Sequence, residues 1–357
     1  MAYDGLIIAD TVKELREAFL MGSITKIVQP EPEELLLTVK NNRKNMKLYI
    51  SANASLPVVY ITEEERPAPK TAPNFCMALR KHIGGGRIKD IRQPDTDFLS
   101  DGLERVICFE IEHLNEMGDR GVVRLFVELM GKHSNIILVK DDGTIIDSIK
   151  HITPSVSSVR EVLPGREYFI PNSGDKKNPL NVKTEEEFTA DISRKNLKCG
   201  KALSASFTGI SNISASEICF RAGVDEEKDV AGLSEMELTA LFKSFTEIMS
   251  EVKEGRFFSN IIYNEKNEPE EFSAIRLCCL ESPSYRVKEF DSISKLLFTF
   301  YSERAQRGRI RQKSEDIRHI LKVLTERTAK KLELQERQLA DSGKKEKFRV
   351  YGELINT

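Results

Sequence analysis

The chain has 357 residues, of which 40% are hydrophobic and 31% are charged. At about 150 residues per domain this length allows two or three domains, and the hydrophobic fraction suffices for an ordinary buried core. The 54 Lys and Arg nearly balance the 56 Asp and Glu, for a formal net charge of -2. The chain as a whole is therefore not a uniformly basic polyanion binder, and only a local basic segment could serve that role.

Apolar patterning and the cysteines narrow the expected environment. No stretch approaches 18 consecutive apolar residues, and the first residues lack the basic and apolar regions of a signal peptide. We expect a cytoplasmic protein that binds no membrane. The six cysteines form no CxxC pair and mostly lie among apolar residues, which favours reduced, buried thiols over zinc ligands or disulfides. No metal or other cofactor is expected.

The first 175 residues combine two helix signals with many short strand signals. Asp10 is placed to cap a helix over residues 11–21, and a second helix, over residues 75–83, ends at three consecutive glycines. The predicted strands are residues 24–28, 34–39, 46–51, 57–61, 87–93, 104–112, 122–130, 135–140 and 144–150. Because the connections are short, the strands should pair antiparallel, which predicts an α+β fold with flanking helices.

Changes of pattern predict three further segments after a boundary near residue 175. Residues 184–252 show helical periodicity with Ser, Thr and Asp caps, typical of a small all-α domain. Residues 256–279 are β-like and predict a hairpin that packs back on a neighbouring domain. We therefore place the domains at residues 1–175, 176–255, 256–290 and 291–357.

The last segment predicts one long helix. From Ile293, apolar residues recur every three or four positions without a proline. An unbroken helix over residues 291–339 would reach roughly 70 Å, beyond the diameter of a small domain, so it should project as the first arm of a coiled coil. A new helical pattern starts near residue 347 and the chain ends within it, so we expect a truncated arm.

This segment is also locally basic. Residues 303–347 hold fourteen Lys and Arg against eight Asp and Glu. Five basic residues without an acid lie close together, at Arg304, Arg307, Arg309, Arg311 and Lys313. Such a cluster could release counterions from an RNA phosphate backbone. The alternative, a solvated helix face or a face that pairs with a second strand, stays open.

No catalytic constellation emerges from the sequence. The five histidines lie far apart without HExxH spacing, and no Ser or Cys stands beside one in a recognisable pattern. Glycines 84–86 close a helix and lead into a strand, which is the reverse of a phosphate-binding loop. We expect a binding protein and not an enzyme, unless a site is assembled only in space.

Residues 207–218 predict a helix, a glycine-containing turn and a second helix. Gly209 permits the tight turn, and the helix that begins near Ser211 offers free N–H groups to a phosphate. This arrangement is typical of the helix-hairpin-helix, which binds nucleic-acid backbones. An ordinary pair of antiparallel helices has the same spacing, so both interpretations stay open.

Several longer motifs, found in one order, are more specific than these features. They are Phe75-Cys76-Met77-Ala78-Leu79-Arg80-Lys81-His82-Ile83, Gly85-Gly86-Arg87-Ile88, Glu128-Leu129-Met130-Gly131-Lys132-His133-Ser134-Asn135, Val162-Leu163-Pro164-Gly165, Phe300-Tyr301-Ser302-Glu303-Arg304-Ala305 and Tyr351-Gly352-Glu353-Leu354. Together they resemble the NFACT family over essentially the whole chain. The resemblance implies an antiparallel-sheet NFACT-N domain, a helix-hairpin-helix domain and the first arm of a coiled coil; full-length members continue into an NFACT-R domain.

The resemblance implies a role in ribosome-associated quality control. Such a protein binds a large ribosomal subunit, through its rRNA, when peptidyl-tRNA and its nascent chain obstruct the subunit. It recruits alanyl-tRNA for template-free alanine tailing, and the ribosome forms the peptide bonds, so the protein selects tRNA and is not an enzyme. The family is also known as fibronectin-binding, which offers a surface adhesin that binds fibronectin as the alternative. The missing signal peptide argues against that alternative.

The resemblance also implies tRNA-binding residues. Family members contact the tRNA anticodon region with an Asp-Arg pair, and the matching residues are Glu104 and Arg105. Glu104 could accept hydrogen bonds from a base edge, and Arg105 could stack on a base or reach a phosphate. Weaker candidates for tRNA contact are Arg80, Lys81, Lys132, His133 and Asn135.

The NFACT-N domain is similar in architecture to formamidopyrimidine-type DNA glycosylases, which offers a third function. Those enzymes use an N-terminal proline amine followed by Glu, and Ala2 and Tyr3 stand at these positions. The cysteines of their zinc finger are also absent. The sequence therefore argues against a glycosylase.

Overall fold

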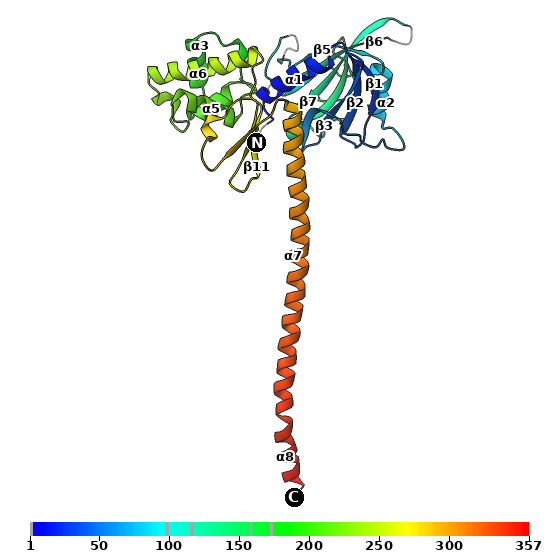
Figure 1. The fold of residues 1–357 in the computed structure, drawn as a ribbon, viewed down its shortest axis with the longest axis vertical. Coiled ribbons are helices and arrows are strands. Elements are labelled where there is room, and N and C mark those ends of the chain that lie inside the picture. Colours follow the sequence, from blue (N-terminus) through cyan, green and yellow to red (C-terminus); the bar gives the residue numbers. More distant parts are fainter. Residues whose placement is uncertain (1–2, 97–99, 115–117, 158, 172–173, 357) are drawn as a thin grey trace. The chain divides into compact units, whose positions relative to one another are not determined.

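The computed structural model describes residues 3–96, 100–114, 118–157, 159–171 and 174–356, and for residues 308–316 the backbone only. The chain divides into two compact units, Met1–Tyr301 and Ser302–Thr357. The first unit contains both sheets and most of the helices, and the second contains most of one long helix (Figure 1). The finer borders predicted near residues 175, 255 and 290 stay predictions.

A nine-stranded sheet forms the centre of the first unit, and its strands pair antiparallel in the order β4-β3-β2-β1-β5-β6-β7-β8-β9. Its strands are Ser23–Val28 (β1), Glu34–Asn41 (β2), Lys44–Ala52 (β3), Pro57–Thr62 (β4), Arg87–Arg92 (β5), Val106–Leu114 (β6), Arg120–Glu128 (β7), Asn135–Lys140 (β8) and Ile145–Ser148 (β9). This confirms the predicted α+β fold with a large antiparallel sheet.

Both faces of the sheet are covered. Along β6, Ile107 and Phe109 belong to the main core with helices α1 (Gly5–Phe19) and α2 (Asn74–Ile83), while Val106 and Cys108 belong to a smaller cluster. Because successive side chains of a strand point to opposite faces, the two clusters lie on opposite sides. A segment after β9 closes the second side.

The first helix begins earlier than the sequence predicted. It starts at Gly5, and Asp4 is its cap, since the Asp4 carboxylate accepts a hydrogen bond from the N–H of Ile7 at 3.1 Å. Asp10 lies inside the helix and accepts a hydrogen bond from the Ser259 hydroxyl at 2.6 Å. The prediction of Asp10 as the cap was wrong because the apolar residues before it belong to the same buried helix face, and its polar side chain serves a tertiary contact.

A helical region and a small sheet complete the first unit. The helices are Glu185–Ser193 (α3), Cys199–Ser206 (α4), Asn212–Ala222 (α5) and Glu235–Lys253 (α6), with short 3-10 turns at Gly131–His133, Pro179–Asn181, Val230–Gly232 and Cys278–Leu280. Strands Asn260–Tyr263 (β10), Pro269–Ser273 (β11) and Arg286–Glu289 (β12) pair in the order β11-β10-β12. The predicted hairpin is β10 and β11. β12 was not predicted because all its side chains are exposed, so it carries no apolar alternation.

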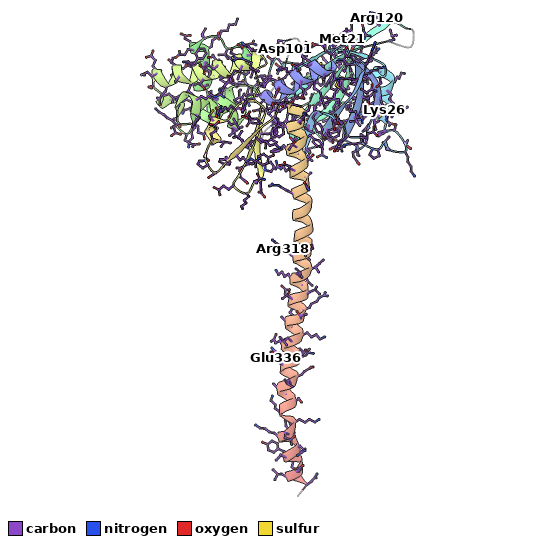
Figure 2. The ribbon with its side chains drawn as sticks, in the orientation of Figure 1. Met21, Lys26, Asp101, Arg120, Arg318 and Glu336 are labelled. Carbon is purple, nitrogen blue, oxygen red and sulfur yellow. The ribbon has the colours of Figure 1, made fainter. Side chains whose placement is uncertain are left out.

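The long helix α7 is continuous over Ile293–Gly343, and α8 follows at Lys345–Ile355. Its first turns are part of the first unit, where Leu296, Leu297 and Phe300 are buried in the core. Farther along, side chains such as Arg318 and Glu336 point away from the helix axis (Figure 2). Across the described helices we find no apolar stretch of the length that crossing a membrane requires.

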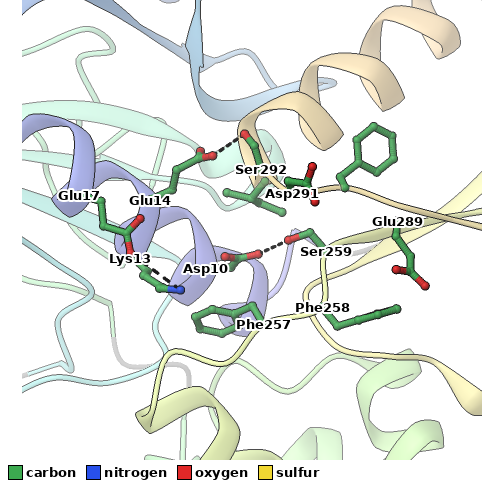
Figure 3. Close-up of a pocket in the computed structure, with 12 residues that line it drawn as sticks. Asp10, Lys13, Glu14, Glu17, Phe257, Phe258, Ser259, Glu289, Asp291 and Ser292 are labelled. Carbon is green, nitrogen blue, oxygen red and sulfur yellow. Dashed lines mark hydrogen bonds and ion pairs between the residues drawn. The ribbon is translucent and has the colours of Figure 1, made fainter.

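Asp10 gives a pH test of the packing around α1. It lines a cavity of about 350 Å³ with Glu14 and Glu17 (Figure 3), and burial raises the pKa of Asp10 to about 6 although the Ser259 hydrogen bond lowers it. An unfolded aspartate titrates near 4. Between these values the folded state binds more protons than the unfolded state. The contribution of this carboxyl to the free energy of unfolding therefore rises as the pH falls.

We predict that Asp10→Asn removes this pH dependence, because the amide oxygen still accepts the Ser259 hydrogen bond but does not titrate. The free energy of unfolding of the unsubstituted protein, relative to the variant, should rise by about 1 kcal/mol between about pH 7.5 and about pH 5. Urea unfolding of both proteins at the two pH values measures the difference. A difference that does not change with pH would contradict the assignment.

Candidate nucleic-acid interface

A pocket of about 220 Å³ in the first unit joins residues that the sequence analysis treated separately. Glu104 and Arg105 enter it from the segment before β6, and Gly209 and Ser211 enter it from the turn between α4 and α5. The complete lining is Asp4, Glu104, Arg105, Met130, Pro171, Lys176, Thr208, Gly209, Ile210 and Ser211. The pocket thus combines the predicted tRNA-binding pair with the predicted hairpin.

The turn between α4 and α5 packs on the start of α1. Gly209 has a φ of +75°, and its carbonyl accepts a hydrogen bond from the N–H of Gly5 at 2.9 Å. A Cβ atom at position 209 would lie 2.3 Å from the carbonyl oxygen of Leu103. Glycine is therefore required here both for the left-handed conformation and for the close approach of three chain segments.

Asp4 occupies the N-terminal end of α5. Its Oδ2 atom accepts hydrogen bonds from the hydroxyls of Ser211 at 2.6 Å and Ser214 at 2.7 Å. The Ser211 hydroxyl also accepts the N–H of Ser214 at 3.3 Å and so caps the helix. Burial raises the pKa of Asp4, and the serine hydrogen bonds partly offset that effect. The N-terminal end of α5, which the sequence predicted as a place for a phosphate, is therefore already occupied by the Asp4 carboxylate.

The predicted pair Glu104 and Arg105 differs in exposure. Arg105 is exposed, whereas Glu104 is only 5% exposed. The backbone of both residues is fixed: the Leu129 N–H donates to the Arg105 carbonyl at 2.9 Å, and the Gln93 amide donates to the Glu104 carbonyl at 2.8 Å. The backbone of Arg105 is therefore held at a defined place while its side chain is exposed, and little of Glu104 can reach a base.

Two lysines that no sequence motif indicated belong to this region: Lys176 lines the pocket with Arg105, and the charge of Lys195 acts on Lys176. The ammonium of Lys176 donates to the Ser204 carbonyl at 2.9 Å, and that of Lys195 donates to the Ala205 carbonyl at 3.0 Å. Burial and the charges of Arg105 and Lys195 lower the pKa of Lys176, while Glu104 opposes that shift. No sequence motif identifies either residue, because each lysine is positioned by its hydrogen bond to a carbonyl in the last turn of α4.

The weaker candidates for tRNA contact differ in their exposure and in their hydrogen bonds. The Asn135 side chain is 2% exposed and binds the backbone of Lys150, so it joins β8 to the segment after β9 and offers little surface to RNA. Arg80 is exposed, but its guanidinium donates to the Ile27 carbonyl at 3.1 and 3.0 Å. Lys81, Lys132 and His133 are exposed.

The basic residues of α7 are only partly described. The side chain of Arg304 is exposed and that of Arg307 is half-buried. The side chains of Arg309, Arg311 and Lys313 lie outside the described residues. Within the part of the chain that is described, no three His, Cys, Asp or Glu side chains gather as they would around a metal ion.

The fold and the motifs define an α+β protein of the NFACT type. The model of the family described as NFACT N-terminal and middle domains matches residues 4–357, and the chain belongs to this family. The Bacillus subtilis protein named Rqc2 homolog RqcH is 36% identical over 356 residues, which cover 99% of this chain and 58% of that protein. The chain therefore spans less than two thirds of this relative.

Two further similarities are informative. The Saccharomyces cerevisiae protein named Ribosome quality control complex subunit 2 is 32% identical over 96 residues, which cover 27% of this chain and 9% of that protein. A solved structure of the N-terminal part of the fibronectin/fibrinogen-binding protein from Streptococcus suis superposes with a TM-score of 0.68 at 29% identity. The superposition covers 85% of this chain and 100% of the Streptococcus suis chain.

The contact at Gly209 can be tested by substitution. Gly209→Ala should lower the free energy of unfolding by about 1–2 kcal/mol for the left-handed backbone and by about 1–3 kcal/mol more for the overlap with Leu103. Gly85→Ala is the matched control, because Gly85 has the same φ of +75° and no atom within 4 Å of an added Cβ. Chemical unfolding measures both variants. Equal losses in the two would show that the turn does not pack on α1 as described.

Proposed function

We propose that this chain is the N-terminal part of a ribosome-associated quality control factor in the cytoplasm. In this proposal the protein binds large ribosomal subunits obstructed by peptidyl-tRNA and recruits alanyl-tRNA, and stalled nascent chains receive alanine tails without a template. The ribosome forms the peptide bonds, so the protein is an adaptor and not an enzyme. Family membership and the names of the Bacillus subtilis and yeast relatives support the ribosomal role.

The observation that carries the RNA-binding part of the proposal is the pocket around Arg105. A permanently charged guanidinium is exposed there on a fixed backbone, beside Lys176 and the turn between α4 and α5. Guanidinium groups bind phosphates with two parallel hydrogen bonds and stack on bases. We assign tRNA contact first to Arg105 and next to the exposed Lys81, Lys132 and His133.

We further propose that the two units contact different RNAs. The helical pair with Gly209 acts as a helix-hairpin-helix, and α7 acts as the first arm of a coiled coil. The basic positions between Arg304 and Lys313 then bind rRNA of the large subunit by releasing counterions from its phosphates. The proposed domains remain residues 1–175, 176–255, 256–290 and 291–357.

The fibronectin/fibrinogen binding named for the Streptococcus suis protein is the alternative function. The similarity to that structure shows a shared fold but identifies no matrix-binding residue in this chain. A cationic pocket fits an RNA ligand and gives no reason to prefer a matrix protein. We therefore do not extend that activity to this chain.

The proposal can be tested by sequencing the RNA that copurifies with the tagged chain from cells. We expect enrichment of large-subunit rRNA and of one tRNA species. Arg105→Gln should lower the tRNA yield about fivefold or more, the effect of losing roughly 1 kcal/mol of charged hydrogen bonding, and leave the rRNA yield unchanged. Arg120→Gln is the matched control, since it removes one exposed arginine at the far end of the β6–β7 ladder, where Arg120 pairs with Leu114, whereas Arg105 precedes the end at which Val106 pairs with Glu128.

Three outcomes would contradict the proposal. They are no enrichment of rRNA over the tag alone, no enrichment of tRNA, or equal tRNA losses in the two arginine variants. Circular dichroism and thermal unfolding of each variant check that the fold is intact.

A further inference from the structure

We propose that Arg105, Lys176 and Lys195 form a binding site for the phosphate groups of an RNA backbone. This inference rests on the proposed function, because it names the part of the RNA that the pocket holds. It differs from the interpretation of the sequence, which assigned backbone phosphates to Gly209 and Ser211, left Arg105 either a base or a phosphate, and included neither lysine. In the structure, the cationic groups are the ones placed to receive the phosphates.

The first observation is that the two lysines are held in place. Their ammonium groups donate to successive carbonyls, those of Ser204 and Ala205, in the last turn of α4. The last carbonyls of a helix have no partner within the helix and carry its partial negative charge, so they hold a cation well. Each ammonium has three donors, and this contact uses one of them. The remaining donors are free to bind an anion.

The second observation is that these cations lack acidic partners. Among the described residues, no carboxylate lies within salt-bridge distance of Arg105, Lys176 or Lys195. Neighbouring basic residues are paired: Lys177 contacts Asp191 at 2.8 Å, and Arg194 contacts the same carboxylate at 3.5 Å. Unpaired like charges that lie close together repel, and a bound anion relieves that repulsion.

The lowered pKa of Lys176 agrees with this arrangement. Burial is its largest cause, and the positive charges of Arg105 and Lys195 add to it. Glu104 is the acidic group that acts in the opposite direction. Asp4, the other acidic residue of the lining, is already bound by the hydroxyls of Ser211 and Ser214. The pocket therefore has cationic groups that its own carboxylates do not neutralise.

The lining favours a phosphate over a base. Proteins that read single-stranded bases stack them on aromatic rings. The described lining of this pocket contains no aromatic side chain, and its apolar members are Met130, Pro171 and Ile210. The N-terminal end of α5 is filled by Asp4, so the phosphate must bind on the lysine side of the pocket. We infer a contact that is independent of RNA sequence.

The test compares two double variants of the full chain in tRNA binding. Lys176→Gln with Lys195→Gln removes both charges, and the Gln amides can still donate to the carbonyls of α4. Lys201→Gln with Lys243→Gln is the matched control, because both lysines are exposed on helices of the same region and the change in charge is equal. The probe is fluorescent deacylated tRNA, titrated at several salt concentrations.

We expect the first double variant to weaken tRNA binding about tenfold. The slope of log affinity against log salt should fall by about 1.4–1.8, the value for two lost phosphate contacts. The control should change affinity less than about twofold, because isolated exposed lysines add little. Equal losses in the two double variants would overturn the phosphate site while leaving tRNA binding by the protein intact.

A second measurement separates this site from the proposed function. In this measurement an amine-reactive ester acylates Lys176, and mass spectrometry quantifies the product. The reaction is run with short-chain polyphosphate as competitor and, separately, with polyglutamate. Polyphosphate should protect Lys176 severalfold more than polyglutamate does. If the protein binds no tRNA, the proposed function fails, and protection by polyphosphate still decides the phosphate site. Absent protection, or equal protection by polyglutamate, would overturn the site.

Discussion

The carboxylate that caps α1 and two carboxylates on that helix hold three later parts of the chain through serine hydroxyls. Each bond costs the desolvation of a buried or half-buried acid, which is offset by hydroxyl donors of complementary geometry. The acids and their partners are Asp4 with Ser211 and Ser214, Asp10 with Ser259, and Glu14 with Ser292 and Ser294. Through them one helix joins the helical region, the small sheet and the root of α7. Asp4 bears most on function, because one oxygen of its carboxylate caps α1 and the other binds the serine hydroxyls at the start of α5.

The pocket follows from that junction. The turn at Gly209 fits against Gly5 and Leu103 only because the segments approach without a side chain between them. Leu103 leads directly into Glu104 and Arg105, so the contact that seats the turn also sets the cationic side chain beside it. Lys176 and Lys195 are then placed by the end of α4. Recognition of an RNA backbone would be a property of this junction, to which no single motif of the chain corresponds.

The sequence predicted those features that depend on local pattern. Alternating apolar residues located the strands of the large sheet, and helical spacing located α2 and α7. It misplaced the cap of α1, because capping propensity cannot distinguish Asp4 from a buried Asp10 that bonds Ser259 from a distant segment. The burial of Glu104 beside an exposed Arg105 could not be foreseen, because both residues precede β6 and the flanking Leu103 and Val106 are buried as well. Nor could the lysine site, because it depends on carbonyls at the end of α4, and the Ser204 carbonyl lies 28 residues from Lys176 along the chain.

The double cap at Asp4 is the central claim of this account, and a double-mutant cycle tests it most directly. Unfolding free energies are needed for Asp4→Ala, Ser214→Ala and the combined variant. If the Asp4 carboxylate and the Ser214 hydroxyl hold α1 and α5 together, the two substitutions should be coupled by about 1–3 kcal/mol. Additive effects, with a coupling below about 0.3 kcal/mol, would contradict a direct bond between the two helices.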